Sequence, residues 1–316
     1  RSNRRKEGKN MSEILIFGHK NPDTDSICSA LVMEKFNKNN GIDVEAVRLG
    51  NINKETKYVL DYLGIKEPRL IERVEDMQPV IMVDHNEFTQ SVDNIQNAKI
   101  EMVIDHHRIC NFETAEPLYY LAEPVGCTAT LICKKFQQAN MKIEKKEAVL
   151  MLSAIISDTL LFKSPTCTEY DKIAAEELAK IAGININEYG MEMLKAGTDL
   201  SDLSEKGLIN LDAKEVMLGD IKAIIAQVNT ASIPEMMKRK DGILKAMQEK
   251  IDEKGLDLFF FAITDIINSN SQAIVLGKRA DIVEASYNVK LEDHTAFLEG
   301  VVSRKKQIIP VLTKNA

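Results

Sequence analysis

The stretch Phe17–Ala30, FGHKNPDTDSICSA, decides the fold because it places a histidine and two carboxylates in one turn. An apolar, strand-like run precedes this turn, and an amphipathic helix is predicted after it. The proline and the Asp-Thr-Asp sequence favour a turn, in which Asp25 or Ser26 could cap the helix. Capping explains one carboxylate at most. A second role for His19, Asp23 and Asp25 therefore has to be considered.

The same alternation of short apolar strands and amphipathic helices continues along the first half of the chain. Strands are predicted at Glu13–Phe17, Asp43–Leu49, Pro79–Val83 and Glu101–Ile104, and helices at Ser26–Asn39, Lys54–Leu63, Glu87–Gln96, Cys127–Ala139, Lys145–Ser157 and Thr168–Ala182. This alternation predicts an α/β fold with a parallel sheet that is covered on both faces. Ligands of such sheets bind beyond the carboxyl ends of the strands.

A polar stretch separates this part from a second, smaller one. The sequence AGTDLSDLSEKG, Ala196–Gly207, has no helical or strand periodicity and holds two glycines, which is typical of a linker. Strand-like runs then follow at 222–228, 256–266, 272–277 and 300–302, with a helix at 233–254. We therefore predict a first domain at 11–196, a linker at 197–207 and a mixed α/β domain at 208–316. Residues 1–10, which precede Met11, are predicted to be a cloning remnant.

Composition narrows the class of protein. The chain has 316 residues, is 44% hydrophobic and 28% charged, and carries a net charge of −7. Such an acidic chain is a poor general binder of nucleic acid. No apolar run approaches the ~18–20 residues of a membrane span, and no signal peptide is evident. Five cysteines without a C-x-x-C pair suggest reduced thiols, so we expect a cytoplasmic protein.

The histidines indicate where the chemistry lies. Four of the five, His19, His85, His106 and His107, follow predicted strands and lie near an aspartate. A lone histidine is more often a structural residue than a ligand, but four at adjacent strand ends favour a metal site. Carboxylates and imidazoles suit Mn²⁺, Co²⁺ and Mg²⁺. More than four ligands are available, which favours two metals that share a carboxylate over one structural zinc.

Such a site is suited to phosphate chemistry. Two metals roughly 3.5–4 Å apart hold a bridging hydroxide and stabilise displacement at phosphorus. The basic run Ser303–Lys306, SRKK, offers cations for the phosphate oxygens. Seen alone, this run would more often be a solvated basic patch. Its apolar flanks place it at a strand end instead, so we expect a cleft with metals on one wall and cations on the other.

Six motifs together resemble a known family: FGHKNPDTDSICSA, VDHNE, VIDHHR, EPVGCTAT, SAIISDTLLFKSPTCT and VVSRKKQ. They are similar to those of family II inorganic pyrophosphatases, the manganese- or cobalt-dependent branch of the Asp-His-His phosphoesterase superfamily, from about Glu13 to Leu312. The resemblance implies hydrolysis of pyrophosphate to two phosphates by a metal-bridged hydroxide in an interdomain cleft. It also implies Mn²⁺ or Co²⁺ at two sites, Mg²⁺ with the substrate, and a homodimer formed through the first domain.

The resemblance assigns a role to each matching residue. The first metal would be bound by His19 and Asp23, the second by Asp25, His106 and Asp158, and both by Asp84. His107 would donate to the leaving phosphate oxygen, and Asp105 would orient an imidazole. Lys214, Arg304 and Lys305 would hold the substrate. The sequence pattern alone does not decide whether Asp158 is a metal ligand, since an aspartate at a helix end could merely cap the next turn.

The sequence leaves two alternative functions open. The chain could hydrolyse short polyphosphates, or it could bind metal or phosphate without catalysis. The glycine-rich motif of nucleic-acid-degrading superfamily members does not occur in the second domain. The short segment Val74–Val83 leaves no room for the nucleotide-sensing insert that some family members carry. We therefore expect no partner besides pyrophosphate and a second copy of the chain: no nucleic acid and no membrane.

Overall fold

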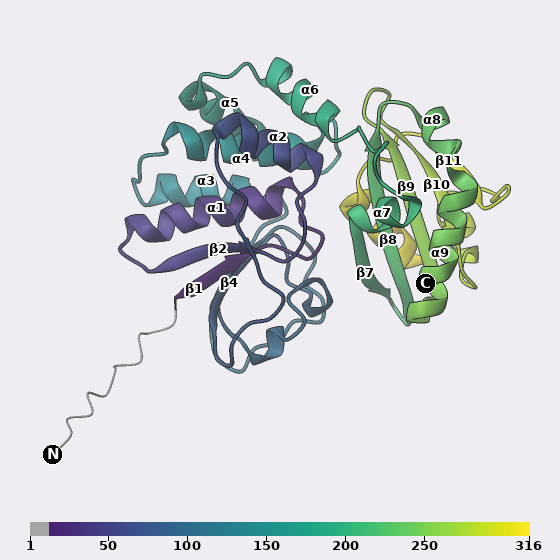
Figure 1. Cartoon of the computed structure of the whole chain (residues 1–316), viewed down its shortest axis with the longest axis horizontal. Helices are drawn as coiled ribbons and strands as arrows, with labels where there is room; N and C mark the ends of the chain where they lie inside the picture. Colours follow the sequence, from purple (N-terminus) through teal and green to yellow (C-terminus); the bar gives the residue numbers. More distant parts are fainter. Residues whose placement is uncertain (1–12) are drawn as a thin grey trace.

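The structure, a computed structural model, describes residues 13–316 and shows two bodies that are each built around one β-sheet (Figure 1). The chain passes from the first body to the second between helices α6 and α7. The predicted cloning remnant at 1–10 lies outside the described residues. The α/β class predicted from the sequence is confirmed.

The first sheet has six strands in the order β3-β2-β1-β4-β5-β6, and every pairing in it is parallel. Its strands are β1 (Ile14–Phe17), β2 (Val44–Arg48), β3 (Arg69–Leu70), β4 (Pro79–Val83), β5 (Lys99–Asp105) and β6 (Tyr119–Ala122). The chain leaves β1 toward β2 on one side and reaches β4 on the other. A crevice at this reversal of strand order, beyond the carboxyl ends, is where parallel sheets bind ligands.

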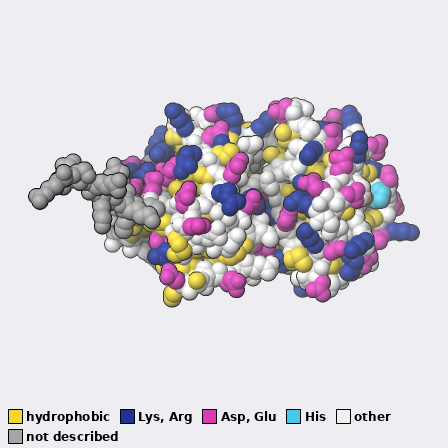
Figure 2. Space-filling model, turned by 60° about the horizontal axis from the view of Figure 1, so that its bottom comes forward, with side chains coloured by type: hydrophobic (Ala, Val, Ile, Leu, Met, Phe, Trp, Pro, Cys, Tyr) yellow, Lys and Arg dark blue, Asp and Glu magenta, His cyan; other side chains and the backbone are white. Residues whose placement is uncertain are grey.

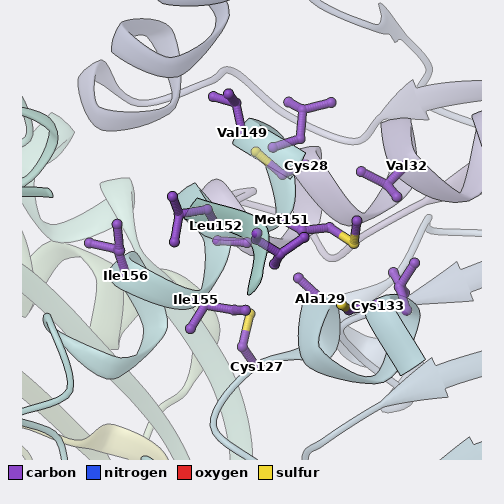
Figure 3. Packing of buried hydrophobic residues seen from close by; sticks show 14 of the residues in the cluster. Cys28, Val32, Cys127, Ala129, Cys133, Val149, Met151, Leu152, Ile155 and Ile156 are labelled. Carbon is purple, nitrogen blue, oxygen red and sulfur yellow. The ribbon is translucent and has the colours of Figure 1, made fainter. Parts of the chain in front are cut away.

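Within residues 13–316, six helices lie on one side of this sheet. They are α1 (Thr24–Asn39), α2 (Lys54–Leu63), α3 (Thr128–Gln138), α4 (Lys145–Thr159), α5 (Glu169–Ala182) and α6 (Ile186–Ala196). Helices α1 and α3 contact the strands, and α4 packs on α1 and α3 in a further layer (Figure 1). The core between helices and sheet is apolar, and Cys28, Cys127 and Cys133 pack in it as small hydrophobic residues (Figure 3). Residues of the connecting segments, including Val74, Val92 and Ile95, cover the other face.

Two local predictions in the first body were wrong, and one of its helices was not predicted. The segment Glu87–Gln96 forms two short 3₁₀ turns, η1 (Phe88–Gln90) and η2 (Ile95–Asn97), instead of a helix. Asn94 fixes this irregular course, because its side chain hydrogen-bonds both the N–H and the C=O of Val74 at 3.0 and 2.8 Å. Helix α1 begins at Thr24 and is capped by Asp23, not by Asp25 or Ser26. Helix α6 was not predicted.

The second sheet is mixed and has the order β11-β10-β9-β8-β7, with β8 and β9 parallel and the other pairs antiparallel. Its strands are β7 (Ala213–Leu218), β8 (Ile221–Thr230), β9 (Leu258–Asp265), β10 (Asn270–Leu276) and β11 (Thr295–Leu298). The helices are α7 (Glu205–Leu211), α8 (Ile233–Met237), α9 (Lys240–Lys254), α10 (Asp281–Tyr287) and α11 (Ile309–Lys314). Separate apolar clusters cover its two faces.

The structure departs from the predictions for the second body at three places. Helix α7 begins at Glu205, inside the predicted linker, because Ser204 caps it by accepting the N–H of Gly207. The predicted helix at 233–254 is divided into α8 and α9. Residues 300–302 form no strand. Ser303 instead accepts the N–H of Lys306 and caps a π-helical segment, η3 (Arg304–Ile308), which carries the basic run.

The surface is mixed in character. On the face shown in Figure 2, acidic and basic side chains are interspersed and hydrophobic ones are scattered. Within residues 13–316, the structure has no helix of the length and apolarity needed to cross a bilayer.

Candidate metal and phosphate site

A cavity of about 390 Å³ lies between the two bodies and is lined by both of them. Residues of the first body that line it lie at the ends of strands and helices and include His106, His107 and Asp158. Residues of the second body that line it include Lys214 and Arg304, together with neighbours on β8 and η3. The candidate site is therefore built at the carboxyl edge of the parallel sheet, as the sequence predicts.

The turn after β1 is shaped by one glycine and one cap. A Cβ on Gly18 would lie 2.3 Å from the Cβ of Ser26, so only glycine allows the turn to fold back on α1. Asp23 caps α1 with one carboxylate oxygen, which accepts the N–H of Ser26 at 2.8 Å. The other oxygen lies 3.2 Å from Nε2 of His19. Asp23 thus starts the helix and still points a carboxylate oxygen at the imidazole.

Asp84 occupies the centre of the site in a strained backbone conformation. It follows β4 directly and has φ of 60°, in the left-handed region that non-glycine residues rarely adopt. Its Oδ2 accepts the hydroxyl of Ser26 at 2.9 Å and lies 3.3 Å from Nε2 of His19. Its Oδ1 lies 3.1 Å from Nε2 of His106. The unusual backbone places one carboxylate between two imidazoles.

A second ligand group surrounds His106. Nε2 of this imidazole lies 3.7 Å from Oδ2 of Asp25 and 3.4 Å from Oδ2 of Asp158. Asp25 is fixed by Ser29, whose hydroxyl donates at 2.7 Å, and by the N–H of Thr128 at 2.9 Å. The Asp158 carboxylate turns toward this group, so it does not act as the helix cap that the sequence had left open.

These side chains form two groups that could each hold a metal ion and that share Asp84, and a third combination joins Asp84 and His106 to His107. The ligand atoms of His19, Asp23 and Asp84 lie within 4.8 Å of one another, and so do those of Asp25, Asp84, His106 and Asp158. Among the described residues, the buried Nε2 of His19 makes no hydrogen bond. A buried polar atom normally has a partner, so an Nε2 facing carboxylate oxygens fits a metal ligand. The residues present therefore fit two divalent ions.

The pKa values reflect the crowding of negative charge. Burial alone would lower the pKa of His19, but the carboxylates of Asp23 and Asp84 outweigh it and raise the pKa to about 10. Burial, followed by the charges of Asp25, Asp23 and Asp84, raises the pKa of Asp158 well above its ordinary value. Without a metal the site therefore holds protons in place of cations.

Asp105 and His107 form a hydrogen-bonded pair beside this cluster. Nδ1 of His107 donates to Oδ1 of Asp105 at 2.7 Å, and Asn86 donates to the other oxygen at 2.7 Å. Burial would raise the pKa of Asp105, but the His107 charge and these hydrogen bonds hold it well below its usual range. The opposite nitrogen of His107, Nε2, faces Nζ of Lys214 at 3.5 Å. One imidazole thus links the first body to a cation of the second.

Lys305 reaches the metal-ligand group itself. Its Nζ donates to the carbonyl of Val125 at 3.1 Å and lies 2.6 Å from Nδ1 of His106. That nitrogen is also 3.0 Å from the same carbonyl. A metal-ligating imidazole usually donates its other N–H to such a carbonyl. The ammonium of Lys305 only donates, so Nδ1 of His106 accepts from it here, and an N–H on Nδ1 would place two donors 2.6 Å apart.

Arg304 is held by an acid that sequence reasoning missed. One terminal nitrogen donates to the carbonyls of Asp212 and Ile225 at 2.7 and 3.2 Å, and the other donates to Oδ1 of Asp212 at 2.7 Å. The guanidinium is nearly buried, at 9% exposure, and lines the cavity. Asp212 was not predicted because a lone aspartate before a strand carries no pattern.

Other residues of the site were also not predicted from the sequence. Some of them lie in recognisable motifs, and others do not. Ser26 and Thr128 lie inside the motifs FGHKNPDTDSICSA and EPVGCTAT, so the motifs could have found them. Asn21 has a left-handed φ of 50° and donates to the carbonyl of Ala213 at 3.1 Å, which joins the two bodies. Nothing in the sequence predicts that contact, because its partners are 192 residues apart.

The comparisons with known proteins cover nearly the whole chain. The sequence matches the DHH family, N-terminal domain, over residues 13–155 and the DHHA2 domain over residues 191–315. A manganese-dependent inorganic pyrophosphatase of Bacillus subtilis is 55% identical over 304 residues, 96% of this chain and 98% of that protein. A crystal structure of a Methanococcus jannaschii protein assigned to the family II inorganic pyrophosphatases has a TM-score of 0.89 at 43% identity, covering 96% of this chain and 99% of that one.

The raised pKa of His19 leads to a prediction about metal uptake. Because its pKa is about 10 without metal, the imidazole is protonated at neutral pH, and a metal ion has to displace that proton. We expect Mn²⁺ binding to release about one proton from this residue and the affinity to rise with pH. Calorimetric titrations in buffers of different ionisation enthalpy measure this release. His19→Gln should release about one proton fewer; an unchanged release would contradict the assignment.

Proposed function

Since this chain belongs to the family of manganese-dependent inorganic pyrophosphatases, we propose that it hydrolyses inorganic pyrophosphate to two phosphates. The observation that carries the proposal is Asp84, which is shared by two groups of metal-ligand type, opposite cations from the second body. Ligands for two divalent ions and cations for phosphate oxygens are what attack on a phosphoric anhydride requires.

The proposed ligands follow from the two groups. His19 and Asp23 bind the first ion, Asp84 binds both, and the second ion is completed by Asp25, His106 and Asp158. Mn²⁺ or Co²⁺ is proposed at both places, because the set holds carboxylates and imidazoles but no thiolate. Bound ions would activate the attacking water and neutralise charge on the attacked phosphate. Ser26, Ser29 and Thr128 orient the carboxylates by hydrogen bonds.

Lys214, Arg304 and Lys305 are proposed to bind the substrate. Pyrophosphate carries several negative charges, which explains why buried cations are gathered beside a cavity whose other wall is acidic. The Arg304 fork contacts phosphate with its geometry fixed by Asp212, whereas each lysine provides a point charge. We also propose that Mg²⁺ accompanies the substrate, since free pyrophosphate would leave some of its charge unbalanced among these residues.

His107 is proposed as the proton donor to the leaving phosphate oxygen. Its Nδ1 already donates to Asp105, so Nε2 can donate only when the ring is protonated at both nitrogens. Burial and then the nearby Lys214 and His106 hold the pKa of His107 well below its ordinary value, while Asp105 opposes them. The charge of a bound pyrophosphate would raise that pKa. Protonation of His107 is thereby tied to the presence of the substrate.

The division of labour between the bodies is also a proposal. Residues 11–196 would carry the metals, 208–316 would bind the substrate, and 197–207 would act as the hinge on which the bodies close. Polar contacts across the cavity support this, including those from Asn21 to Ala213 and from Lys306 to the carbonyl of Pro165 at 2.8 Å. Each contact would break if the bodies separated.

We further propose a cytoplasmic homodimer that forms through the first body. Strand β3 lies at the edge of the parallel sheet, and Leu70 on this strand is exposed, as is Met77 nearby. An edge strand with exposed apolar side chains is suited to pairing with a second copy. The five free cysteines suit a reducing compartment.

An assay of phosphate release tests the proposed function directly. We expect the Mn²⁺-loaded protein to release phosphate from pyrophosphate and to leave a dinucleotide intact. Chelator dialysis should abolish the activity, and Mn²⁺ or Co²⁺ should restore it better than Zn²⁺, which favours a closed tetrahedral site. Tripolyphosphate tests the alternative of a short-chain polyphosphatase. Full activity without metal, or faster hydrolysis of tripolyphosphate, would refute the assignment.

The shared position of Asp84 predicts different metal contents in two variants. Asp84→Ala should lose both ions, because its carboxylate serves both groups, whereas Asp25→Ala should lose chiefly one. Metal analysis after gel filtration measures the content, and circular dichroism confirms that each variant is folded. Loss of the same single ion from both variants would remove the bridging role.

Substitution of Arg304 is expected to lower the activity without lowering the metal content. We expect Arg304→Ala to lower kcat/KM on pyrophosphate at least ~10²-fold, or roughly 3 kcal/mol of transition-state binding, with both ions retained. Arg304→Lys should recover only part, because a point charge does not reproduce the fork. Steady-state kinetics with metal analysis decides the matter. Near-full activity of Arg304→Ala would make the basic run a surface patch.

A further inference from the structure

The first turn of α2 lies between the linker and the two helices whose ends carry proposed metal ligands. Lys54 and Glu55 are consecutive in this turn, and both line the cavity. Neither residue belongs to a proposed ligand or substrate contact. Their side chains nevertheless contact different parts of the machinery, which suggests that the turn has a function of its own.

Glu55 connects the start of α1 to the end of α4. It is buried, with 6% of its side chain exposed. Its Oε1 accepts the hydroxyl of Thr24 at 2.5 Å and also the hydroxyl of Ser157. Thr24 lies between Asp23 and Asp25, and Ser157 directly precedes Asp158. One carboxylate oxygen therefore holds together the backbone segments that carry three proposed ligands.

The same turn contacts the linker. Nζ of Lys54 lies 2.6 Å from Oδ1 of Asp202 and 3.2 Å from Oδ2 of Asp199. Gly197 lies against Glu55 so closely that a Cβ built on this glycine would be 3.1 Å from the Cβ of Glu55. The start of the linker is thus packed against the residue that joins the two ligand-bearing segments.

A purely structural role for Glu55 is the simpler alternative, but it does not fit the charges nearby. A further buried carboxyl near Asp23 and Asp212 is unfavourable, both by loss of hydration and by repulsion between carboxylates. A neutral side chain would satisfy two hydroxyls without that repulsion. A carboxylate, however, gives stronger hydrogen bonds to the hydroxyls that it orients. A carboxylate at position 55 therefore positions the two hydroxyls accurately at a cost in the stability of the folded protein.

We propose that Glu55 is a positioning residue for the metal ligands, and that Lys54 couples it to the linker, so that the closed arrangement of the two bodies tightens the metal site. The inference rests on the metal assignment made in the proposed function. It predicts that changes to Lys54, which pairs with the linker residues Asp199 and Asp202, alter metal affinity. Contacts that orient ligands typically change metal affinity 10–100-fold when they are lost.

Mn²⁺ binding in the absence of substrate, followed by electron paramagnetic resonance, tests the role of Glu55. We expect Glu55→Ala to weaken Mn²⁺ binding by about 10-fold or more and to lower kcat, while Glu55→Gln, which keeps an acceptor oxygen but loses the charge, recovers only part of both. Should Glu55→Ala fail to fold, Ser157→Ala removes one of the same hydrogen bonds without a buried void. Unchanged Mn²⁺ affinity in a folded Glu55→Ala or Ser157→Ala would overturn the proposal.

A matched pair on α2 tests the coupling to the linker. Lys54→Met should weaken Mn²⁺ binding in low salt, and the difference from the parent should shrink in high salt, since the ion pairs are exposed. Lys57 is the control, because it pairs with Asp61 at 2.7 Å on the same helix and does not contact the linker. Lys57→Met should leave Mn²⁺ affinity unchanged; equal effects of the two substitutions would refute the coupling.

The readouts separate this inference from the proposed function. Mn²⁺ affinity is measured without pyrophosphate. If the parent protein binds Mn²⁺ but does not hydrolyse pyrophosphate, the proposed function is refuted. An effect of Glu55 variants on Mn²⁺ affinity would still support the positioning role in that case. A parent protein that hydrolyses pyrophosphate, with Glu55 variants that bind Mn²⁺ normally, would remove the positioning role alone.

Discussion

Repulsion among carboxylates is the constraint on which the rest of the structure depends. Asp25 and Asp84 are buried, Asp23 and Asp158 are half-buried, and all lie around two imidazoles. Buried like charges a few ångströms apart repel strongly, because the protein interior screens them poorly. The cluster is stable only when protons or cations balance it, so a protein that keeps these residues together is built to bind cations.

The fold provides what this constraint requires. Parallel strands bring the ends of β1, β4 and β5 to one edge, where His19, Asp84 and Asp105 come close together although they are far apart in the sequence. The apolar core beneath this edge packs the strands and helices closely, which would limit the reorganisation that the side chains at the edge need in order to bind a metal. The backbone strain at Asp84 is tolerated for the same reason.

Strand ends and histidines carry a readable pattern, so the sequence locates this edge. His85 does not join the cluster, however, because its ring nitrogens contact the carbonyl of Val83 and the hydroxyl of Ser91 at 2.8 and 3.0 Å. Periodicity located β1, β4 and β5 and the residues that follow them, and the family resemblance supplied the roles of His107 and Arg304. What could not be predicted depends on contacts between distant segments. Asp212 becomes recognisable only once η3 lies beside β7, and the course of 87–96 is set by Asn94 binding to Val74. Hydrophobic periodicity contains no information about such side-chain-to-backbone bonds.

The two bodies are electrostatically dependent on each other. The ammonium of Lys305, from the second body, offsets the negative charge of Asp158 and Asp84 in the first, and it donates to the carbonyl of Val125. A divalent ion held by the proposed ligands would offset the same carboxylates, which would leave the ammonium of Lys305 free for phosphate oxygens. Ligand binding on one wall and charge on the other are consequently linked, and neither body would have this property alone.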